Sequence, residues 1–233
     1  MQTILLYSHA SGPNSWKPVL VLEELKLPYE LKPVVWGELK KPSYTAINPN
    51  GRVPSMTDPN TGVTVFESGA IMEYLIAEYD KDNLLHYTGL PEKYETQSWL
   101  HFQMSGQGPY FGQRAWFLHF QPGEKIVPAI ERYGNEVKRV LGVLDSHLSG
   151  GAEKKGGRQY LVGDKCTYAD LAWVPWDWAI EQALFIPNAP DSVTLDVEKE
   201  FPHFAKWHQR LDQRPAVVKT KELKAAETAN SQH

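Results

Sequence analysis

The chain has 233 residues, a formal net charge of −4 and 22% charged residues. Acidic and basic residues are mixed, and no apolar run approaches the ~20 residues that span a bilayer, so we expect neither nucleic acid nor a membrane as partner. The start lacks the basic and apolar segments of a signal peptide. The single cysteine, Cys166, excludes an internal disulfide framework, and we therefore expect a cytoplasmic protein.

Residues 1–80 alternate strand-like and helical patterns, which predicts a small mixed sheet with helices on its faces. We expect strands at Thr3–Ser8 and Tyr29–Val35, a hairpin of Ser55–Asp58 and Val63–Phe66 around Pro59–Gly62, helices from Ser15 to about Leu27 and over Ser68–Tyr79, and a short helical turn over Lys40–Ile47.

Residues 81–91 are polar and are expected to form a linker, after which residues 92–233 are almost wholly helical in pattern. The expected helices are Glu92–Phe120 with an interruption at Gly106–Pro109, Pro128–Leu148, Thr167–Leu184, Phe201–Gln213 and Ala216–Thr228, with a surface loop at Gly150–Gln159. Thr167 and Asp170 have the spacing of a capping box, which satisfies amides at a helix start.

Asn48–Pro54 reads NPNGRVP, a turn that leads into a strand through Val53 and Pro54. Proline donates no backbone hydrogen bond, so the amide and carbonyl of Val53 are expected to stay free for a partner outside the sheet. A cis Val53–Pro54 bond would hold this edge still. A few residues later, Glu67 and Ser68 stand where a helix exposes unpaired amides and the positive end of its dipole. A free strand edge beside such a helix start suits a peptide with an α-amine and an α-carboxylate, and glutathione is such a peptide.

Ser11–Asn14 (SGPN) joins the first strand to the first helix, the position of the Cys-x-x-Cys pair in thioredoxin-like sheets. Ser11, Asn14 and nearby amides could stabilise a bound thiolate there. Lowering a thiol pKa by ~2 from about 8.5 requires about 2.7 kcal/mol, and one or two charge-assisted hydrogen bonds of roughly 1.5–3 kcal/mol supply it. Alone, the pattern is more typical of an ordinary helix start. Combined with Val53–Pro54 and Glu67–Ser68, it favours a binding site.

Other candidate residues have weaker signals. Arg132 is either a solvent-facing cation or a charge that reaches a ligand carboxylate. Tyr7 lies inside the first strand, which favours packing over catalysis. Cys166 is expected to be a buried structural thiol. The histidines show no metal-ligand spacing, and we expect no metal site. Tyr110, Trp116 and Phe117 either line an apolar pocket or pack in the core, and packing is the better interpretation for any one of them.

Over nearly its full length the chain resembles the cytosolic glutathione transferase superfamily. The motifs are Val53-Pro54, Phe66-Glu67-Ser68-Gly69-Ala70-Ile71 and Thr167-x-x-Asp170. SHASGPN (8–14), NPNGRVP (48–54), GPYFGQ (108–113) and Ile130–Tyr133 are similar to the Nu-class bacterial disulfide-bond oxidoreductases and to fungal proteins like the yeast nitrogen-catabolite regulator.

This resemblance implies a thioredoxin-like N-terminal domain, an all-α C-terminal domain and a homodimer. It implies that Asn14 contacts the glutathione sulfur, that Val53 pairs with the cysteinyl backbone, and that Glu67 and Ser68 hold the γ-glutamyl end. The expected binding set is completed by Arg52, Pro54, Arg132 and either Lys40 or Lys41. Leu39 departs from the family, because relatives often have a polar side chain there.

Two mechanisms are consistent with the resemblance, and each uses glutathione as co-substrate. One is conjugation of glutathione to a small hydrophobic electrophile; the other is reduction of a disulfide, with two glutathiones or glutathione disulfide in the site. The alternatives from other classes are a glutathione-binding regulatory protein and a ligandin-type carrier with little turnover.

Overall fold

The computed structural model describes residues 1–151 and 157–230, which form two compact units. The first unit holds residues 1–86 and the segment from Gln213 onward, and the second holds Tyr87–Asp212. Of the expected loop Gly150–Gln159, residues 152–156 lie outside the described part.

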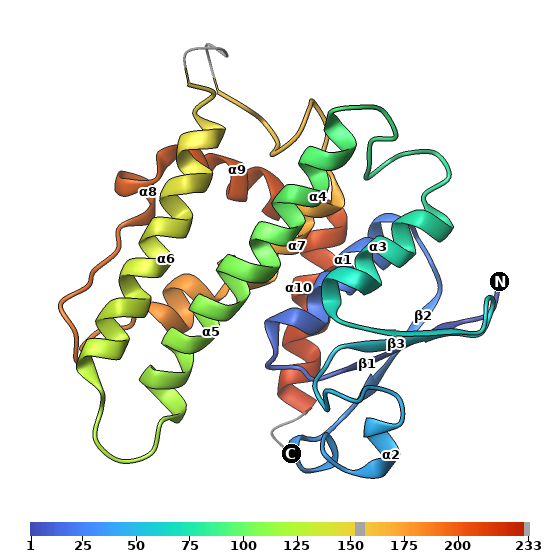
Figure 1. Cartoon of the computed structure of the whole chain (residues 1–233), viewed down its shortest axis with the longest axis horizontal. Coiled ribbons are helices and arrows are strands. Elements are labelled where there is room, and N and C mark those ends of the chain that lie inside the picture. The colour runs from blue at the N-terminus through green and yellow to red at the C-terminus, as the bar shows by residue number, and fades with distance from the viewer. Residues whose placement is uncertain (152–156, 231–233) are drawn as a thin grey trace. The chain divides into compact units, whose positions relative to one another are not determined.

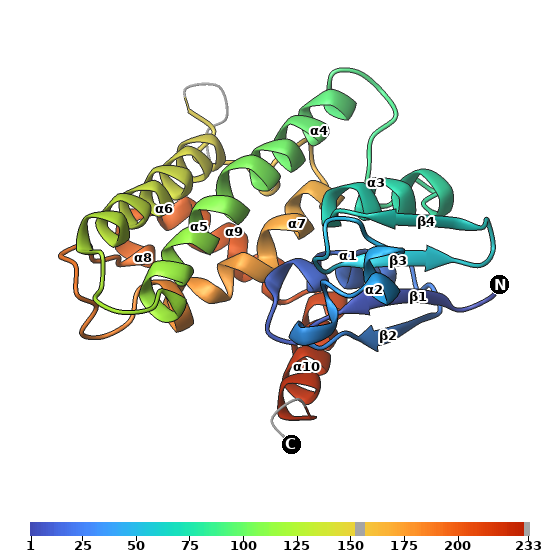
Figure 2. The same cartoon turned by 60° about the horizontal axis from the view of Figure 1, so that its bottom comes forward.

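The first unit contains a four-stranded sheet in the order β2-β1-β3-β4 (Figures 1 and 2). β1 runs parallel to β2 and antiparallel to β3, and β3 pairs antiparallel with β4. Its elements are β1 (Ile4–Ser8), α1 (Pro13–Glu24), β2 (Tyr29–Pro33), a 3-10 turn η1 (Trp36–Glu38), α2 (Pro42–Thr45), β3 (Ser55–Asp58), β4 (Val63–Phe66), α3 (Ser68–Tyr79) and α10 (Pro215–Asn230).

Helices cover both faces of this sheet, with α1 and α3 on one side and α2 on the other (Figure 1). Ile4 and Leu6 of β1 are fully buried, as alternation along a strand requires for one face. α10 packs along α1, where Arg214 donates to both carboxylate oxygens of Glu24 at 2.6 and 2.9 Å. The last helix therefore belongs to the core of the first unit.

The second unit is helical. Its elements are α4 (Glu92–Phe102), η2 (Gln103–Gln107), α5 (Gly108–Ala115), η3 (Trp116–Phe120), α6 (Val127–Leu148), α7 (Tyr168–Asp177), η4 (Ile180–Leu184), α8 (Val197–Glu200) and α9 (Pro202–Asp212), where η2, η3 and η4 are π-helical turns. The interruption expected at Gly106–Pro109 is found as the π-helical turn η2, which joins α4 to α5 without ending the helix.

Asp170 is the main polar anchor of the second unit. Its fully buried carboxylate accepts four hydrogen bonds: from the amide and hydroxyl of Thr167, both at 2.8 Å, from the Leu161 amide at 2.9 Å, and from Trp207 Nε1 at 2.9 Å. Burial raises the pKa of Asp170, and the hydrogen bonds oppose that rise. The expected capping box is thus confirmed, and it also ties α7 to α9.

A second buried charge fixes the α5–α6 contact. Arg114 is fully buried, forms an ion pair with Asp191 at 2.9 Å, and donates to the carbonyls of Ile130 and Leu184 at 2.6 Å each. At Gly134 on α6, a Cβ atom would lie 2.3 Å from Arg114 Nη1, so only glycine fits. The arginine therefore joins three separate segments of the helical unit.

The thioredoxin-like sheet and the helical second unit confirm the expected fold class. The hairpin and α3 begin and end at the expected residues. The first helix begins at Pro13, two residues before the expected start, because proline is favoured at the first helical position. The expected helix Thr167–Leu184 is wrong as one element, since α7 ends soon after Pro175, which lacks one helical donor.

One further difference concerns the second unit. The short helix α8 was not expected, although Asp196 caps it by accepting from the Lys199 amide at 3.1 Å, a recognisable signal. The division of the chain at residues 81–91 remains a prediction.

The hydrogen bonds of Asp170 predict a large stability effect. Replacing Asp170 with Ala leaves several buried donors without an acceptor, which should lower the free energy of unfolding by roughly 3 kcal/mol. Urea denaturation followed by circular dichroism measures it. Glu124→Ala, at an exposed loop position, is the control and should change stability by less than about 0.5 kcal/mol. Equal midpoints for the two variants would contradict the anchor role of Asp170.

Candidate functional site

Three segments meet at one end of the sheet of the first unit. Tyr7, near the end of β1, pairs with Ser55 at the start of β3, and Ser55 pairs in turn with Phe66 at the end of β4. The turn before α1, the Val53–Pro54 segment before β3, and the Glu67–Ser68 segment after β4 therefore lie at the same sheet end (Figure 2). Strand register therefore places the Ser11–Asn14, Val53–Pro54 and Glu67–Ser68 segments at one end of the sheet.

The Val53 backbone is free at this end. The preceding carbonyl, that of Arg52, accepts from the Tyr44 hydroxyl at 2.8 Å and from Asn48 Nδ2 at 2.6 Å. The Val53–Pro54 bond is cis, as expected. Among the described residues, the amide and carbonyl of Val53 have no hydrogen-bond partner. An extended peptide can therefore pair with Val53 without displacing anything in the sheet.

Both lysines considered for binding have partners in the structure, Lys40 in the turn before Val53 and Lys41 in η1. Lys40 Nζ donates to the Asn50 carbonyl at 2.7 Å, and Lys41 Nζ pairs with Glu38 at 2.5 Å. Gly51 has a φ of 60°, and a Cβ atom there would lie 2.8 Å from the Lys40 side chain. Glycine is thus required where Lys40 crosses the turn.

An apolar cluster packs beside this turn. Leu39 and Tyr44 are buried together with Val34, and Tyr7 packs against this cluster with its ring edge-on to Tyr44, centroids 6.2 Å apart. Leu39 therefore packs inward and does not face a ligand. Tyr7 is a packing residue of β1, in agreement with the sequence analysis.

At the start of α1, Gly12 is the capping residue, Pro13 the first helical residue and Asn14 the second. The backbone amide of Ser11 donates to His9 Nδ1 at 3.3 Å, so that nitrogen acts as an acceptor. The Ser11 hydroxyl lies 3.0 Å from the same nitrogen and donates to it in the tautomer that carries its proton on Nε2. Burial lowers the pKa of His9, which favours the neutral ring that this arrangement needs. In this tautomer the hydroxyl proton of Ser11 is used in the hydrogen bond to His9.

Glu67 holds an unusual backbone conformation at the start of α3. Its φ of 71° and ψ of 121° place a non-glycine residue in the left-handed half of conformational space, which costs on the order of 1–3 kcal/mol. Its carboxylate is exposed and accepts from Asn50 Nδ2 at 3.4 Å, while Ser68 beside it is buried. The strained backbone thus directs a carboxylate outward, next to the unpaired amides of a helix start.

A buried lysine lies near this carboxylate. Lys17 on α1 is 1% exposed, and burial lowers its pKa from 10.5 to about 7, although the negative charge of Glu67 opposes that change. A lysine is seldom buried unless it interacts with a charge or a polar group. Lys17 is the functional-site neighbour that the sequence analysis missed. Its one signal was a cation inside the apolar run Trp16–Val21.

The remaining sequence-predicted residues belong to the second unit. Arg132 lies on an exposed part of α6 and has no hydrogen bond or ion pair with any residue in the described ranges. Phe117 stacks on Tyr133 with ring centroids 5.7 Å apart, and Tyr110 and Trp116 extend this half-exposed aromatic group. These rings pack together while keeping part of their surface accessible.

The described residues contain no group of three or more His, Cys, Asp or Glu side chains that could hold a metal ion. Within the same ranges, no helix is both long and apolar enough to span a bilayer. Cys166 is buried, and its thiol donates to the Thr167 carbonyl at 3.7 Å, as a structural thiol does.

Comparison with known families gives two matches that follow these units. The glutathione S-transferase N-terminal domain matches residues 11–78, and the glutathione S-transferase C-terminal domain matches residues 109–215. The chain belongs to the glutathione S-transferase family. The N-terminal match covers the α1 start, the Val53–Pro54 edge and the Glu67–Ser68 segment, whose individual roles remain predictions.

Relatives place the chain in the fungal, Ure2-like branch of the family. The glutathione S-transferase-like protein OpS6 of Beauveria bassiana is 46% identical over 97% of this chain and 98% of its own. Glutathione S-transferase 2 of Schizosaccharomyces pombe is 44% identical over the full length of both. The glutathione transferase URE2P6 of Phanerochaete chrysosporium, solved in complex with oxidized glutathione, has a TM-score of 0.87 and 45% identity over 97% of this chain and 98% of that one.

The lowered pKa of Lys17 predicts a pH-dependent stability. Between pH about 7 and 10.5 the unfolded chain holds a proton that the folded chain has released, so stability rises with pH across this window. Relative to Lys17→Met, the wild-type protein should gain about 2 kcal/mol in its free energy of unfolding between pH 7 and 9. Urea denaturation at each pH provides the measurement.

Lys81→Met is the matched control for this experiment, since Lys81 is an exposed lysine of the same unit. Its stability should follow the wild-type pH profile. If wild type and Lys17→Met gave parallel profiles, the lysine would be protonated in the folded protein throughout, and the argument from burial would be wrong.

Proposed function

We propose that this protein is a glutathione-dependent enzyme that activates the thiol of bound glutathione for conjugation to electrophiles, for reduction of small disulfides, or for both. The observation that carries the proposal is the free Val53 backbone, which lies at the same sheet end as the helix starts of α1 and α3. Glutathione has an extended backbone, an ammonium, two carboxylates and a thiol, and each has a complementary group there.

In this proposal the cysteinyl backbone pairs with Val53, beside Pro54. The α-ammonium of the γ-glutamyl residue binds the exposed Glu67 carboxylate, and its α-carboxylate binds Ser68 and the first amides of α3. The strained conformation of Glu67 supports this assignment, because such strain occurs mainly at functional sites.

The glycyl carboxylate is assigned to a cation of the same region. Arg52 is exposed, whereas Lys40 and Lys41 hold Asn50 and Glu38. Either lysine must exchange its partner to bind the ligand. The exchange costs little, since exposed pairs contribute only about 0–1 kcal/mol. Arg132 is proposed to add a contact from the helical unit.

Asn14 is the better candidate for thiol activation. The Ser11 hydroxyl donates its proton to His9, so it is not poised to donate to a thiolate. Asn14 lies in the first turn of α1, where its amide and the helix dipole both favour an anion. In this proposal the Asn14 amide holds the glutathione sulfur, although the protein supplies no thiol of its own at this position.

Both reactions follow from one activated sulfur. In conjugation the glutathione thiolate attacks an electrophilic carbon and a leaving group such as chloride departs. In disulfide reduction the thiolate attacks one sulfur and the other leaves as a thiolate that takes up a proton. A second glutathione then attacks the mixed disulfide, which yields glutathione disulfide and a second free thiol.

One relative solved in complex with oxidized glutathione and Ure2p solved in complex with glutathione together support a site that accepts both oxidation states. The homodimer and the cytoplasmic location remain predictions carried by the family resemblance and by the single cysteine.

A paired assay tests the function. The full chain is assayed with glutathione and either 1-chloro-2,4-dinitrobenzene or 2-hydroxyethyl disulfide, and turnover above the uncatalysed rate is expected with at least one. If calorimetry shows glutathione binding but neither assay shows turnover, the protein is a regulatory or carrier protein and not an enzyme. Absence of glutathione binding would refute the proposal entirely.

Asn14→Ala should lower turnover about tenfold or more while changing glutathione affinity less, because its contact is to the atom whose charge changes. Steady-state kinetics and calorimetry separate the two effects. Glu67→Ala, remote from the sulfur, is the contrasting variant and should mainly weaken affinity. Unchanged turnover in Asn14→Ala would exclude this amide from the chemistry and leave the backbone amides of α1.

A further inference from the structure

A second concave site lies within the helical unit. It is a pocket of about 320 Å³ whose wall carries four basic side chains: Arg158, His203, Lys206 and Arg210. No Asp or Glu is among its lining residues in the described part of the chain. Basic residues are therefore concentrated in this pocket, although the chain as a whole has a net charge of −4.

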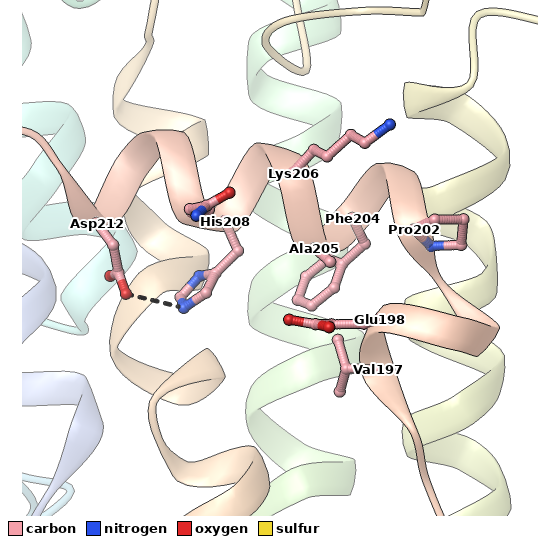
Figure 3. Close-up of a pocket in the computed structure, with 9 residues that line it drawn as sticks. Val197, Glu198, Pro202, Phe204, Ala205, Lys206, His208 and Asp212 are labelled. Atoms are coloured by element: carbon pink, nitrogen blue, oxygen red, sulfur yellow. Dashed lines mark ion pairs between the residues drawn. The ribbon is translucent and has the colours of Figure 1, made fainter.

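Helix α9 supplies three of these basic side chains by its spacing. His203, Lys206 and Arg210 stand at i, i+3 and i+7, and the buried Trp207 at i+4 forms the floor between them. In Figure 3 the Lys206 side chain points away from the side of α9 where His208 and Asp212 form an ion pair at 3.4 Å. Lys206 borders both this pocket and the neighbouring one in Figure 3, and Glu198 and Asp212 line only the neighbouring one.

The fourth basic side chain, that of Arg158, comes from the loop that follows α6. Gly157 has a φ of 82°, and a Cβ atom there would lie 2.9 Å from the Leu148 carbonyl. This close approach, together with the hydrogen bond from the Arg158 amide to the same carbonyl at 2.7 Å, fixes Arg158 at the pocket. Its Nε atom is buried and has no hydrogen-bond acceptor among the described residues. A buried guanidinium donor without an acceptor is costly unless a ligand supplies one.

The nearby carboxylates are already used. Asp145 accepts from the amides of His203 and Phe204 at 2.7 and 3.0 Å, which caps α9. Asp170 is saturated by the bonds described above. Arg210 keeps its position through a bond from Nη1 to the Gln159 carbonyl at 2.9 Å, and this neutral partner leaves its charge uncompensated. Among the described residues, neither carboxylate forms an ion pair with the basic side chains that line the pocket.

We propose that this pocket binds a phosphate dianion, either free or as a small phosphomonoester. Two guanidinium groups offer planar pairs of donors that match phosphate oxygens, and Lys206 adds a point charge. The pocket volume lies at the lower end of the range for small-molecule sites, which favours a ligand of a few carbon atoms over a larger one. The glutathione site of the first unit does not enter this inference.

Isothermal titration calorimetry on the full chain tests the proposal, with inorganic phosphate, glucose 6-phosphate and glucose as probes at constant ionic strength. Both anions should bind with one-to-one stoichiometry and glucose should not. Tighter binding of glucose 6-phosphate identifies a phosphomonoester site, and equal affinities identify a site for phosphate itself. Lys206→Gln and Arg158→Gln should each raise the dissociation constant about tenfold.

Lys199→Gln is the charge-matched control, since Lys199 is an exposed lysine of the same unit that does not line the pocket. Its affinity for phosphate should stay within twofold of wild type, and conjugation or disulfide turnover should be unchanged in Lys206→Gln. The proposal is overturned if phosphate gives no saturable heat, or if all three variants weaken binding alike.

Discussion

The proposed glutathione site depends on the position of one carbonyl group. Tyr44 and Asn48 donate to the Arg52 carbonyl, and at about 1 kcal/mol each these bonds fix the chain just before Val53. Because that carbonyl is satisfied from the α2 side, the next peptide unit turns its own donor and acceptor away from the sheet. The free edge is therefore built by side chains that never need to touch the ligand.

Two charged side chains of the first unit, those of Glu67 and Lys17, are placed in the same part of the structure. Glu67 is exposed in a strained conformation, and Lys17 beneath it is buried with a lowered pKa. The exposed Glu67 carboxylate therefore lies at a helix start, and it interacts electrostatically with a buried lysine whose pKa is lowered to about 7. In the second unit, by contrast, Arg114 and Asp170 are buried with complete sets of partners, and they serve the packing of helices.

Much of this architecture could be predicted from local sequence. The β3–β4 hairpin and α3 were predicted to the residue, because Pro59–Gly62 and the segment before Ser68 are strong local signals. The site segments were also recognisable, since Val53–Pro54 and Glu67–Ser68 carry specific chemistry. Lys17 and the role of His9 toward Ser11 were missed, because each depends on a neighbour that only the folded chain supplies. The ligand contacts of Arg132, Lys40 and Lys41 remain predictions.

The return of the chain to its first unit has a consequence for biosynthesis. α10 covers α1 through the buried side chains of Val217 and Thr220 and through the Arg214–Glu24 bond, yet it follows α1 by roughly 190 residues. On the ribosome, the apolar flank of α1 stays uncovered while the whole helical unit emerges. The nascent thioredoxin-like part must therefore wait, or be shielded by a chaperone, until the final helix leaves the exit tunnel.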